Sequence, residues 1–404
     1  MRQVTNEAAD SPITGALLSG VRVLDLSEGV PGPFAAKLLA YLGAEVIKIE
    51  HPERGDSSRC ASPFLNDLPN PETSGSFLYL NGGKKSVTLD VATSTGAHVL
   101  KQLVKESQVL IESYRPGYLE ELGLDYETLE RVNPSFVLTS VTHFGRNGPY
   151  SQYRGGELVD FAAGGNLNLM GLPERSPIKF GGNAGQYLGA VSTLSGTMLA
   201  LYSAEGTGVG QHVDVSIQES LVCCHIQDLC NYAYTGEVQG RGHGSMIYPC
   251  KDGYVGLTLQ QHLWPRVCAM LDMPELEHDP MFATFQGRRE NADLLDVHII
   301  GWMIERTKEE VYHQAQGFNM PTGYVATVED IVKSPQHAAR SFIVEMDHPE
   351  AGRLKYPGAP FRIAGVEVDH RRAPTLGEHN AEVLCGLLGY DNSDLVMLRG
   401  AGII

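Results

Sequence analysis

The sequence has few basic residues for its length. Of 404 residues, 31 are Lys or Arg and 48 are Asp or Glu, so the formal net charge is −17. No run of Lys and Arg interrupts this acidic background. Because such a surface repels a phosphate backbone, we expect no nucleic-acid partner. An anionic ligand would need local exceptions to the overall field.

The sequence also lacks the segments that carry a protein into a membrane. No uninterrupted apolar stretch approaches the roughly 18 residues that a membrane helix needs. The first twenty residues, MRQVTNEAADSPITGALLSG, do not show the charged-then-apolar pattern of a signal peptide. We therefore expect no membrane association and a cytoplasmic location.

Cysteines are few and are not spaced as metal ligands. The seven cysteines are an odd number and none forms a paired metal motif. Cys223, Cys224 and Cys230 share one segment, which predicts thiols in apolar surroundings on a buried helix. The histidines, His143 among them, show no metal-ligand spacing either, so we expect no metal site.

Apolar runs of strand length alternate with helical patterns over the first 145 residues. A strand, a Gly/Pro turn, a helix and a second strand make a β–α–β unit, which joins parallel strands. Further along, a small-residue helix is expected at 185–204, a long helix at 218–235, a hairpin at 248–259 and a last helix at 378–388. The sequence therefore predicts an α/β fold with a largely parallel sheet. The strands are expected at 21–27, 45–49, 86–90, 108–112 and 136–142, with helices at 33–42, 95–106 and 118–131.

Two glycine-rich segments resemble nucleotide motifs but stand in the wrong context. GGKKS at 82–86 has Leu78 where a phosphate loop needs its first glycine, and its lysines lead into a strand. GTGVG at 206–210 follows a helix and precedes a strand, which reverses the dinucleotide fingerprint.

Turns after the predicted strands are better placed to bind a ligand. VPGPF at 30–34 begins a helix, where unpaired N–H groups can face an anion, although a tight connection alone would also use Gly and Pro. SYRPG at 113–117 is either a structural turn or a site in which Tyr114 stacks and Arg115 pairs with phosphate. Glu157, after two glycines, is either a site carboxylate or a surface residue.

An ordered set of motifs resembles the family III CoA-transferases, the group of formyl-CoA and carnitine-CoA transferases. It includes GVRVLDLSEGVPGPFAAKLLAYLGAEVIKIEHPERGD, ESYRPG, LGLDYETLERVNP, SVTHFGRNGPY, GTGVGQHVDVSIQES and YPCKDGYV, and it runs from about residue 19 to 400. The resemblance implies a Rossmann-like large domain plus a smaller α+β domain, in an interlocked, chain-link dimer. We then expect the large, CoA-binding domain at 19–215, a linker helix and Gly-rich loop at 216–247, the small domain at 248–330, and at 331–404 a return linker and C-terminal segment that pack on the large domain.

The resemblance also implies the ligand, a CoA thioester, and its contacts. The matching positions are Val30, Pro31, His51, Ser113, Tyr114 and Arg154, joined by Arg115 from the SYRPG turn. His51 and Ser113 stand where relatives often carry Arg and Asn. The family's nucleophile is an aspartate about twenty-one residues before the Thr-Gly of the TG.GQ motif. Counting back from Thr207 gives position 186, which is Gln186, and residues 181–190 contain no acid.

A glutamine amide cannot run the family's covalent route, because it is neutral and a very weak nucleophile. The resemblance therefore favours a transferase that moves CoA from a donor such as succinyl-CoA to a carboxylic acid. This chain would be the subunit without the nucleophile, working beside a homologous catalytic subunit. Alternatives are a self-sufficient (homodimeric) transferase that uses Glu157, an isomerase or racemase acting on acyl-CoA, and a non-catalytic acyl-CoA-binding protein. The bases of the racemase branch fall at Gly156 and Gln186, which weakens that alternative.

Overall fold

The computed structural model describes residues 16–241 and 247–404, which divide into two compact units. Unit 1 comprises the chain up to Met170, Ile178–Gln239 and Ser341–Ile404, and unit 2 comprises Gly171–Pro177 and Gly240–Arg340. Most of the segment expected to lack a signal peptide and part of the predicted Gly-rich loop (242–246) lie outside the described residues.

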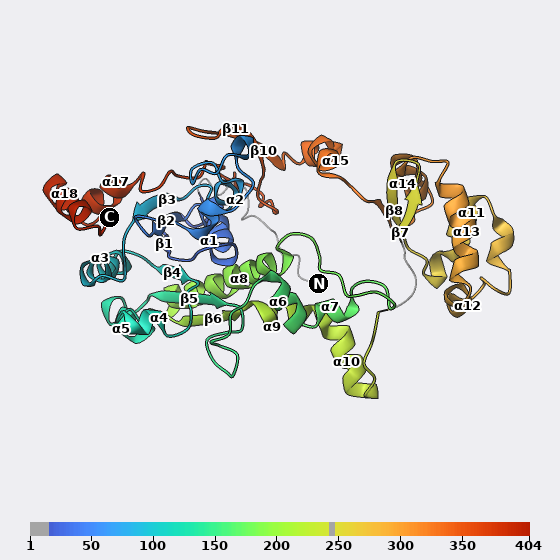
Figure 1. The fold of residues 1–404 in the computed structure, drawn as a ribbon, viewed down its shortest axis with the longest axis horizontal. Helices are drawn as coiled ribbons and strands as arrows, with labels where there is room; N and C mark the ends of the chain where they lie inside the picture. The colour runs from blue at the N-terminus through green and yellow to red at the C-terminus, as the bar shows by residue number, and fades with distance from the viewer. Residues whose placement is uncertain (1–15, 242–246) are drawn as a thin grey trace, which may run out of the picture. The chain divides into compact units, whose positions relative to one another are not determined.

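Unit 1 is built on a six-stranded parallel sheet in the order β3-β2-β1-β4-β5-β6, which confirms the predicted α/β fold (Figure 1). The strand order reverses between β1 and β4. The carboxyl ends of the strands at such a reversal are where open α/β sheets bind ligands. The strands are β1 (Arg22–Asp25), β2 (Glu45–Glu50), β3 (Lys85–Thr88), β4 (Val109–Glu112), β5 (Val137–Thr142) and β6 (His212–Ser216).

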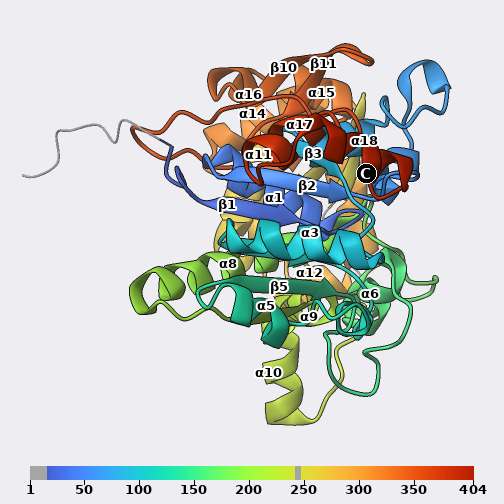
Figure 2. The same cartoon turned by 90° about the vertical axis from the view of Figure 1, so that its left-hand side faces the viewer.

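Both faces of this sheet are buried, as the unbroken apolar runs of the strands require. Successive side chains point to opposite faces, so Leu24 and Val23 belong to different hydrophobic clusters. Helix α3 (Ser94–Lys105) and α5 (Tyr126–Val132) cover one face, and Figure 2 shows α3 in front of the sheet, running along the strands. Helices α1 (Pro31–Tyr41) and α8 (Ala184–Thr207) pack together on the other face.

Two predicted helices are interrupted. The helix expected at 118–131 is α4 (Tyr118–Glu121) followed by α5, because Gly123 takes a positive φ of 63° and Asp125 caps α5 by accepting from Thr128 N at 2.9 Å. The helix expected at 218–235 is divided into α9 (Ile217–Val222), a 3-10 turn and α10 (Ile226–Thr235). Four helices of unit 1 were not predicted: α2 (Gly75–Leu80), α6 (Glu157–Ala163), α7 (Asn166–Leu169) and α18 (Asn392–Gly400), which follows the helix expected to be the last.

The segment after residue 340 is more ordered than a linker. It forms the antiparallel hairpin β10 (Ile343–His348) and β11 (Gly352–Pro357), then α17 (Asn380–Gly386) and α18 (Asn392–Gly400). Asn380 pairs with Thr88 twice: its Oδ1 accepts from Thr88 N at 2.8 Å and its Nδ2 donates to Thr88 Oγ1 at 2.7 Å. These bonds fasten the C-terminal segment to β3.

The prediction of buried thiols near residue 223 is wrong. Cys223, Cys224 and Cys230 are all exposed. The segment is amphipathic, but no other part of residues 16–241 and 247–404 covers α10, whose Leu229 and Tyr232 are also about half exposed, at 49% and 56%. The apolar residues that suggested a buried helix therefore form an open surface.

Unit 2 combines a small antiparallel sheet with helices. The hairpin predicted at 248–259 is confirmed as β7 (Ile247–Cys250) and β8 (Gly253–Leu257), and β9 (Thr322–Tyr324) adds a third strand beside β8. Its core surrounds the fully buried Trp264. The helices are α11 (Trp264–Leu271), α12 (Phe285–Glu290), α13 (Ala292–Met303), α14 (Lys308–Gly317), α15 (Val328–Lys333) and α16 (Pro335–Ala339).

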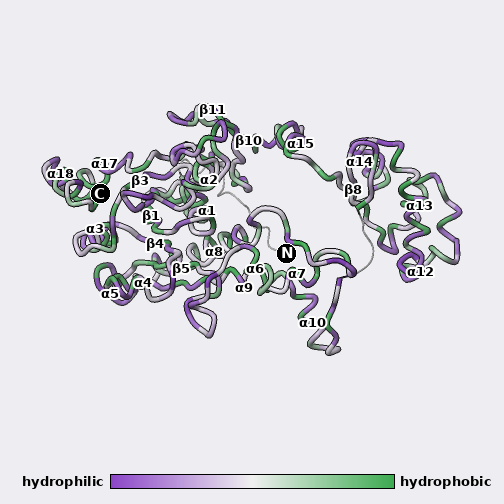
Figure 3. The backbone as a smooth tube through the Cα atoms, viewed as in Figure 1, coloured by the Kyte–Doolittle hydropathy of each residue, from purple (hydrophilic) through white to green (hydrophobic). Residues whose placement is uncertain are grey.

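Hydrophobic stretches are short throughout the chain. Figure 3 shows them interrupted repeatedly by hydrophilic residues, within helices as well as between them. Among the residues that the structure describes, no helix has both the length and the apolar character needed to cross a bilayer.

Helix α1 buries a lysine without a carboxylate partner in the described parts of the chain. Lys37 is 1% exposed, and its Nζ lies 3.6 Å from the ring centroid of Tyr79 and 5.1 Å from that of Tyr41. Burial, with a smaller contribution from the charge of Lys84, lowers the pKa of Lys37 to about 7. The folded protein therefore holds this amine largely neutral under mildly alkaline conditions.

This lysine should make stability depend on pH. Between the folded pKa of about 7 and the ordinary value of 10.5, the unfolded chain binds one proton more than the folded chain, so the free energy of unfolding rises with pH. At about 1.4 kcal/mol per pKa unit, the contribution is on the order of 3–5 kcal/mol. Lys37→Met should be more stable than the wild type at pH 7 and should flatten this rise. Denaturant titrations of both proteins at pH 7 to 10 measure the difference, and parallel curves would contradict the assignment.

Candidate functional site

A cavity of about 620 Å³ lies at the carboxyl ends of the central strands of unit 1. It is formed by the turn after β1, the turn after β4, the end of β5, the loop 151–156 and the first turn of α8. These elements surround the point where the strand order reverses. The cavity therefore lies at the edge of the sheet where the sequence predicted a ligand.

Seven of the nine predicted site residues line this cavity: Val30, Pro31, Ser113, Tyr114, Arg115, Arg154 and Gln186. Glu157 does not line it but is hydrogen-bonded to the backbone of Gln186. His51 lines a separate small pocket that shares Glu28 and Tyr114 with the cavity. These seven residues were predicted from the sequence to share one site, although they lie up to 156 positions apart in the chain.

The turn after β1 offers fewer amide donors than its place at a helix start suggests. Pro31 and Pro33 have no N–H, and Phe34 N already donates to Val30 O at 3.0 Å. Gly29 N donates to Asp56 Oδ1 at 3.2 Å. Proline at the first helical position fixes the backbone for α1, so this turn shapes the cavity more than it supplies positive potential.

Polar contacts fix the turn after β4 to the turn after β1. Ser113 Oγ accepts from Glu28 N at 2.8 Å, which joins the two turns. Glu112, which is fully buried at the end of β4, accepts from Tyr114 N at 2.7 Å. Burial raises the pKa of Glu112 to about 7, against opposing hydrogen bonds from Ser140 and Tyr114 and the charge of Arg146. The ring of Tyr114 packs against Tyr118 with 4.8 Å between centroids.

Two arginines supply positive charge at the cavity. Arg115 forms an exposed ion pair with Glu121, with 2.5 Å between Nη2 and Oε2. Arg154 is exposed and has no ion pair within residues 16–241 and 247–404. Since a guanidinium binds phosphate through two parallel hydrogen bonds, Arg154 is the freer of the two to meet an anionic ligand.

A remote carboxylate caps the first turn of α8. Glu157 Oε1 accepts from Gly185 N at 2.9 Å and its Oε2 accepts from Gln186 N at 3.0 Å. Asn183, the N-cap residue just before the helix, makes no side-chain cap bond within the described residues. A carboxylate at this end satisfies free N–H groups and complements the helix dipole. The Glu157 side chain is only 9% exposed and has Lys179 Nζ at 3.9 Å.

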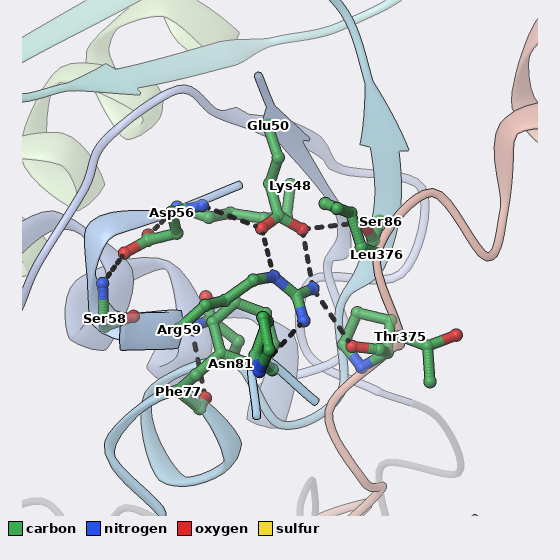
Figure 4. Close-up of polar contacts among 12 residues, drawn as sticks. Lys48, Glu50, Asp56, Ser58, Arg59, Phe77, Asn81, Ser86, Thr375 and Leu376 are labelled. Atoms are coloured by element: carbon green, nitrogen blue, oxygen red, sulfur yellow. Dashed lines mark hydrogen bonds and ion pairs between the residues drawn. The ribbon is translucent and has the colours of Figure 1, made fainter. Parts of the chain in front are cut away.

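A network of buried charges joins β2 to the segment that follows it (Figure 4). Arg59 binds Glu50 through Nε–Oε2 at 2.6 Å and Nη2–Oε1 at 2.9 Å, and Lys48 Nζ lies 2.6 Å from Asp56 Oδ2. All four side chains are fully buried or nearly so. Asp56 also holds Gly29 N, so the network reaches the turn that lines the cavity.

Lys84, from the GGKKS segment that resembles a phosphate loop, belongs to the same network. Lys84 Nζ lies 2.6 Å from Asp25 Oδ2, 2.8 Å from Pro33 O and 2.7 Å from Asn81 Oδ1. Its side chain is inaccessible to solvent. Lys84 therefore has a structural role in which it neutralises a buried aspartate.

One pair at the cavity was missed by sequence reasoning. His143, just after β5, lines the cavity, and its Nδ1 lies 2.8 and 3.0 Å from the two carboxylate oxygens of Asp160. Asp160 is on α6 and is completely buried. The position of His143 at a strand end was the available signal, but its partner is on a helix that was not predicted.

Residues 18–380 match the family model described as CoA-transferase family III, and the chain belongs to that family. It is 33% identical to the succinyl-CoA–D-citramalate CoA-transferase of Chloroflexus aurantiacus, over 96% of this chain and 98% of that one. It is 32% identical to the succinyl-CoA:(R)-benzylsuccinate CoA-transferase subunit BbsE of Thauera aromatica, over 95% of this chain and 98% of that one. The structure of a CAIB/BAIF family protein from Brucella suis superposes with a TM-score of 0.82 at 28% identity, covering 92% of this chain and 99% of that one.

These matches confirm the family that the motifs indicated, and with it CoA-transferase chemistry on CoA thioesters. The cavity offers side chains that suit such a ligand: an aromatic ring, two guanidinium groups and a small-residue turn. Among the residues that the structure describes, no group of three His, Cys, Asp or Glu side chains could hold a metal ion.

Proposed function

We propose that the cavity of unit 1 binds an acyl-CoA thioester and that this chain is a CoA-transferase subunit without a nucleophile of its own. Val30, Pro31, Ser113, Tyr114, Arg115 and Arg154 would contact the CoA moiety, with His51 at the neighbouring pocket. The observation that carries the proposal is Gln186, a neutral side chain that lines the cavity at the position of the family nucleophile. CoA would move from a donor such as succinyl-CoA to a carboxylic acid on a homologous subunit.

The contacts of Glu157 do not favour it as a substitute nucleophile. Both of its oxygens accept hydrogen bonds from the first turn of α8, and the side chain is almost buried. An attacking carboxylate would have to give up at least one of these bonds and leave N–H groups unsatisfied. Leaving a buried donor unpaired costs about 1–3 kcal/mol, which adds directly to the barrier. The self-sufficient transferase is therefore the weaker alternative.

Exposed apolar side chains on unit 1 support an obligate partner. On α8, Leu199 and Tyr202 are 72% and 80% exposed, and on α10, Ile226 and Tyr234 are 67% and 88% exposed. Apolar surface of this extent on a single chain is typical of an interface. A second, homologous chain in an interlocked dimer would cover it. The relative BbsE is itself named as a subunit of a transferase, which agrees with a heteromer.

Native mass spectrometry of the complex from the host cell tests this proposal. We expect this chain to occur with one homologous CoA-transferase chain, and we expect transfer from succinyl-CoA to an acid only when both are present. Full transfer activity from the purified chain alone would contradict it.

Arg154→Ala should weaken CoA binding because it removes the cavity guanidinium that has no ion pair among the described residues. We expect Kd for CoA to rise about 10-fold, which corresponds to about 1.4 kcal/mol for a charge-assisted contact. Isothermal calorimetry at low salt measures the change. Arg289→Ala, at an exposed arginine of unit 2, is the matched control and should leave Kd unchanged. An unchanged Kd in Arg154→Ala would remove this residue from the site.

A further inference from the structure

The cavity contains a histidine whose orientation is fixed by a buried acid. Asp160 receives His143 Nδ1 between its two oxygens, at 2.8 and 3.0 Å, and the Asp160 side chain has no exposed surface. The His143 side chain is 34% exposed. A carboxylate on Nδ1 fixes the tautomer in which Nε2 is the free, basic nitrogen.

The imidazole ring is also held by its packing. A Cβ atom on Gly155 would lie 2.1 to 2.5 Å from Cγ, Cβ and Cδ2 of His143, so only glycine fits against the ring there. The backbone of His143 is held as well, since its carbonyl accepts from Gln218 N at 3.0 Å. The ring is therefore oriented from the Asp160 side, from the Gly155 side and through its own backbone.

The cavity also offers two polar groups that are free to contact a ligand. No hydrogen bond within the described residues engages His143 Nε2 or the side-chain amide of Gln186, and both residues line the same cavity. The other ionisable side chains lining it are Glu28, Tyr114, Arg115, Tyr153 and Arg154. In the part of the chain that the structure describes, none of these five side chains is oriented by a buried carboxylate as His143 is by Asp160.

We propose that His143 is a general base that activates water to hydrolyse an acyl-CoA thioester in this cavity, with Asp160 as its positioning residue. The inference rests on the proposed binding of the thioester there. Nε2 takes a proton from water as the water oxygen bonds to the thioester carbonyl carbon. The Gln186 amide donates to the carbonyl oxygen as it becomes an oxyanion.

The tetrahedral intermediate then collapses and the C–S bond breaks. The proton on Nε2 passes to the departing CoA sulfur, so the products are the carboxylic acid and free CoA, and His143 is restored. Acyl-CoA and water are consumed one to one, and no oxidant, metal or second substrate is needed. With the neutral Gln186 and the His143–Asp160 pair at one cavity, the site has a base to activate water and no carboxylate at 186 to form an enzyme–CoA thioester.

Kinetics of the full-length chain with acetyl-CoA and benzoyl-CoA test the inference. Loss of thioester absorbance is the readout, because the exposed cysteines would react with a thiol reagent. We expect hydrolysis by the wild type, and a decrease of about 10²- to 10⁴-fold in kcat for His143→Gln with KM unchanged. Asp160→Asn should lower kcat, again at constant KM, and Asp160→Glu should recover part of it. His98→Gln, at an exposed histidine on α3, is the matched control and should match the wild type.

Calorimetric titration of the same proteins with CoA separates this inference from the proposed function. CoA binding without hydrolysis, or hydrolysis that survives His143→Gln, would overturn the inference and leave the proposed function standing. Exchange of deuterium into the α-position of the acyl group without CoA release would also overturn it, in favour of proton abstraction. Absence of CoA binding would overturn both.

Discussion

Gln186→Asp is expected to give this chain the first half of the transferase reaction. An aspartate at 186 would place a carboxylate at the cavity, where it can attack a donor thioester and become an enzyme–CoA thioester. We expect exchange of labelled succinate into succinyl-CoA to rise about 10²-fold above the wild type, less than a complete site would give, because a misplacement of about 1 Å is costly. This exchange needs one chain and no acceptor acid.

Gln186→Asn is the matched control for this experiment. It has the length of aspartate but stays neutral, so it should remain at the wild-type rate. The Glu157 carboxylate, bonded to the same helix turn, would sit near the new charge and raise the pKa of the introduced carboxyl. Equal exchange by Gln186→Asn and Gln186→Asp, or by the wild type, would show that position 186 is not where the nucleophile belongs.

Arg59→Met is expected to be the most destabilising single change considered for unit 1. Arg59 is fully buried, bonds Glu50 through two nitrogens and stacks 3.6 Å from the Phe77 ring centroid. Methionine would leave Glu50 as a buried charge whose remaining donors, among the described residues, are Ser86 Oγ and Asp56 N. Breaking one side of a buried ion pair costs about 3–5 kcal/mol.

Hydrogen exchange of the amides in β1 and β2 measures this loss in the correct unit. Both tryptophans, Trp264 and Trp302, belong to unit 2, so tryptophan fluorescence would not report it. Lys333→Met is the control, because Lys333 and Glu329 form an exposed pair that contributes about 0–1 kcal/mol. A loss below 1 kcal/mol for Arg59→Met would mean that the network in Figure 4 does not hold this part of the fold together.

The sheet could be predicted from the sequence because each strand is buried on both faces and reads as an unbroken apolar run. The hairpin β10–β11 could not, since Pro349 and Pro357 suggested a linker. Its inward residues, Met346 and Tyr356, contact Phe77 and Leu78 of the N-terminal half. Such long-range packing leaves no local pattern in the chain.

Part of the candidate site could also be predicted from the sequence, and part depends on tertiary contacts. Its turns follow strand ends, so the sequence alone places Val30 and Tyr114 at one edge of the sheet. The His143–Asp160 pair could not, because the two residues are 17 positions apart and their contact depends on how α6 packs under the loop after β5. The capping of α8 by Glu157 is likewise a tertiary contact.

We expect this chain to bind an acyl-CoA in the cavity of unit 1 without becoming covalently attached to CoA. Intact mass spectrometry of the wild-type chain after incubation with succinyl-CoA tests it most directly. We expect a complex with one CoA species under native conditions and an unmodified chain after denaturation. A denatured chain heavier by one CoA less one water would contradict it, whichever carboxylate carried the thioester.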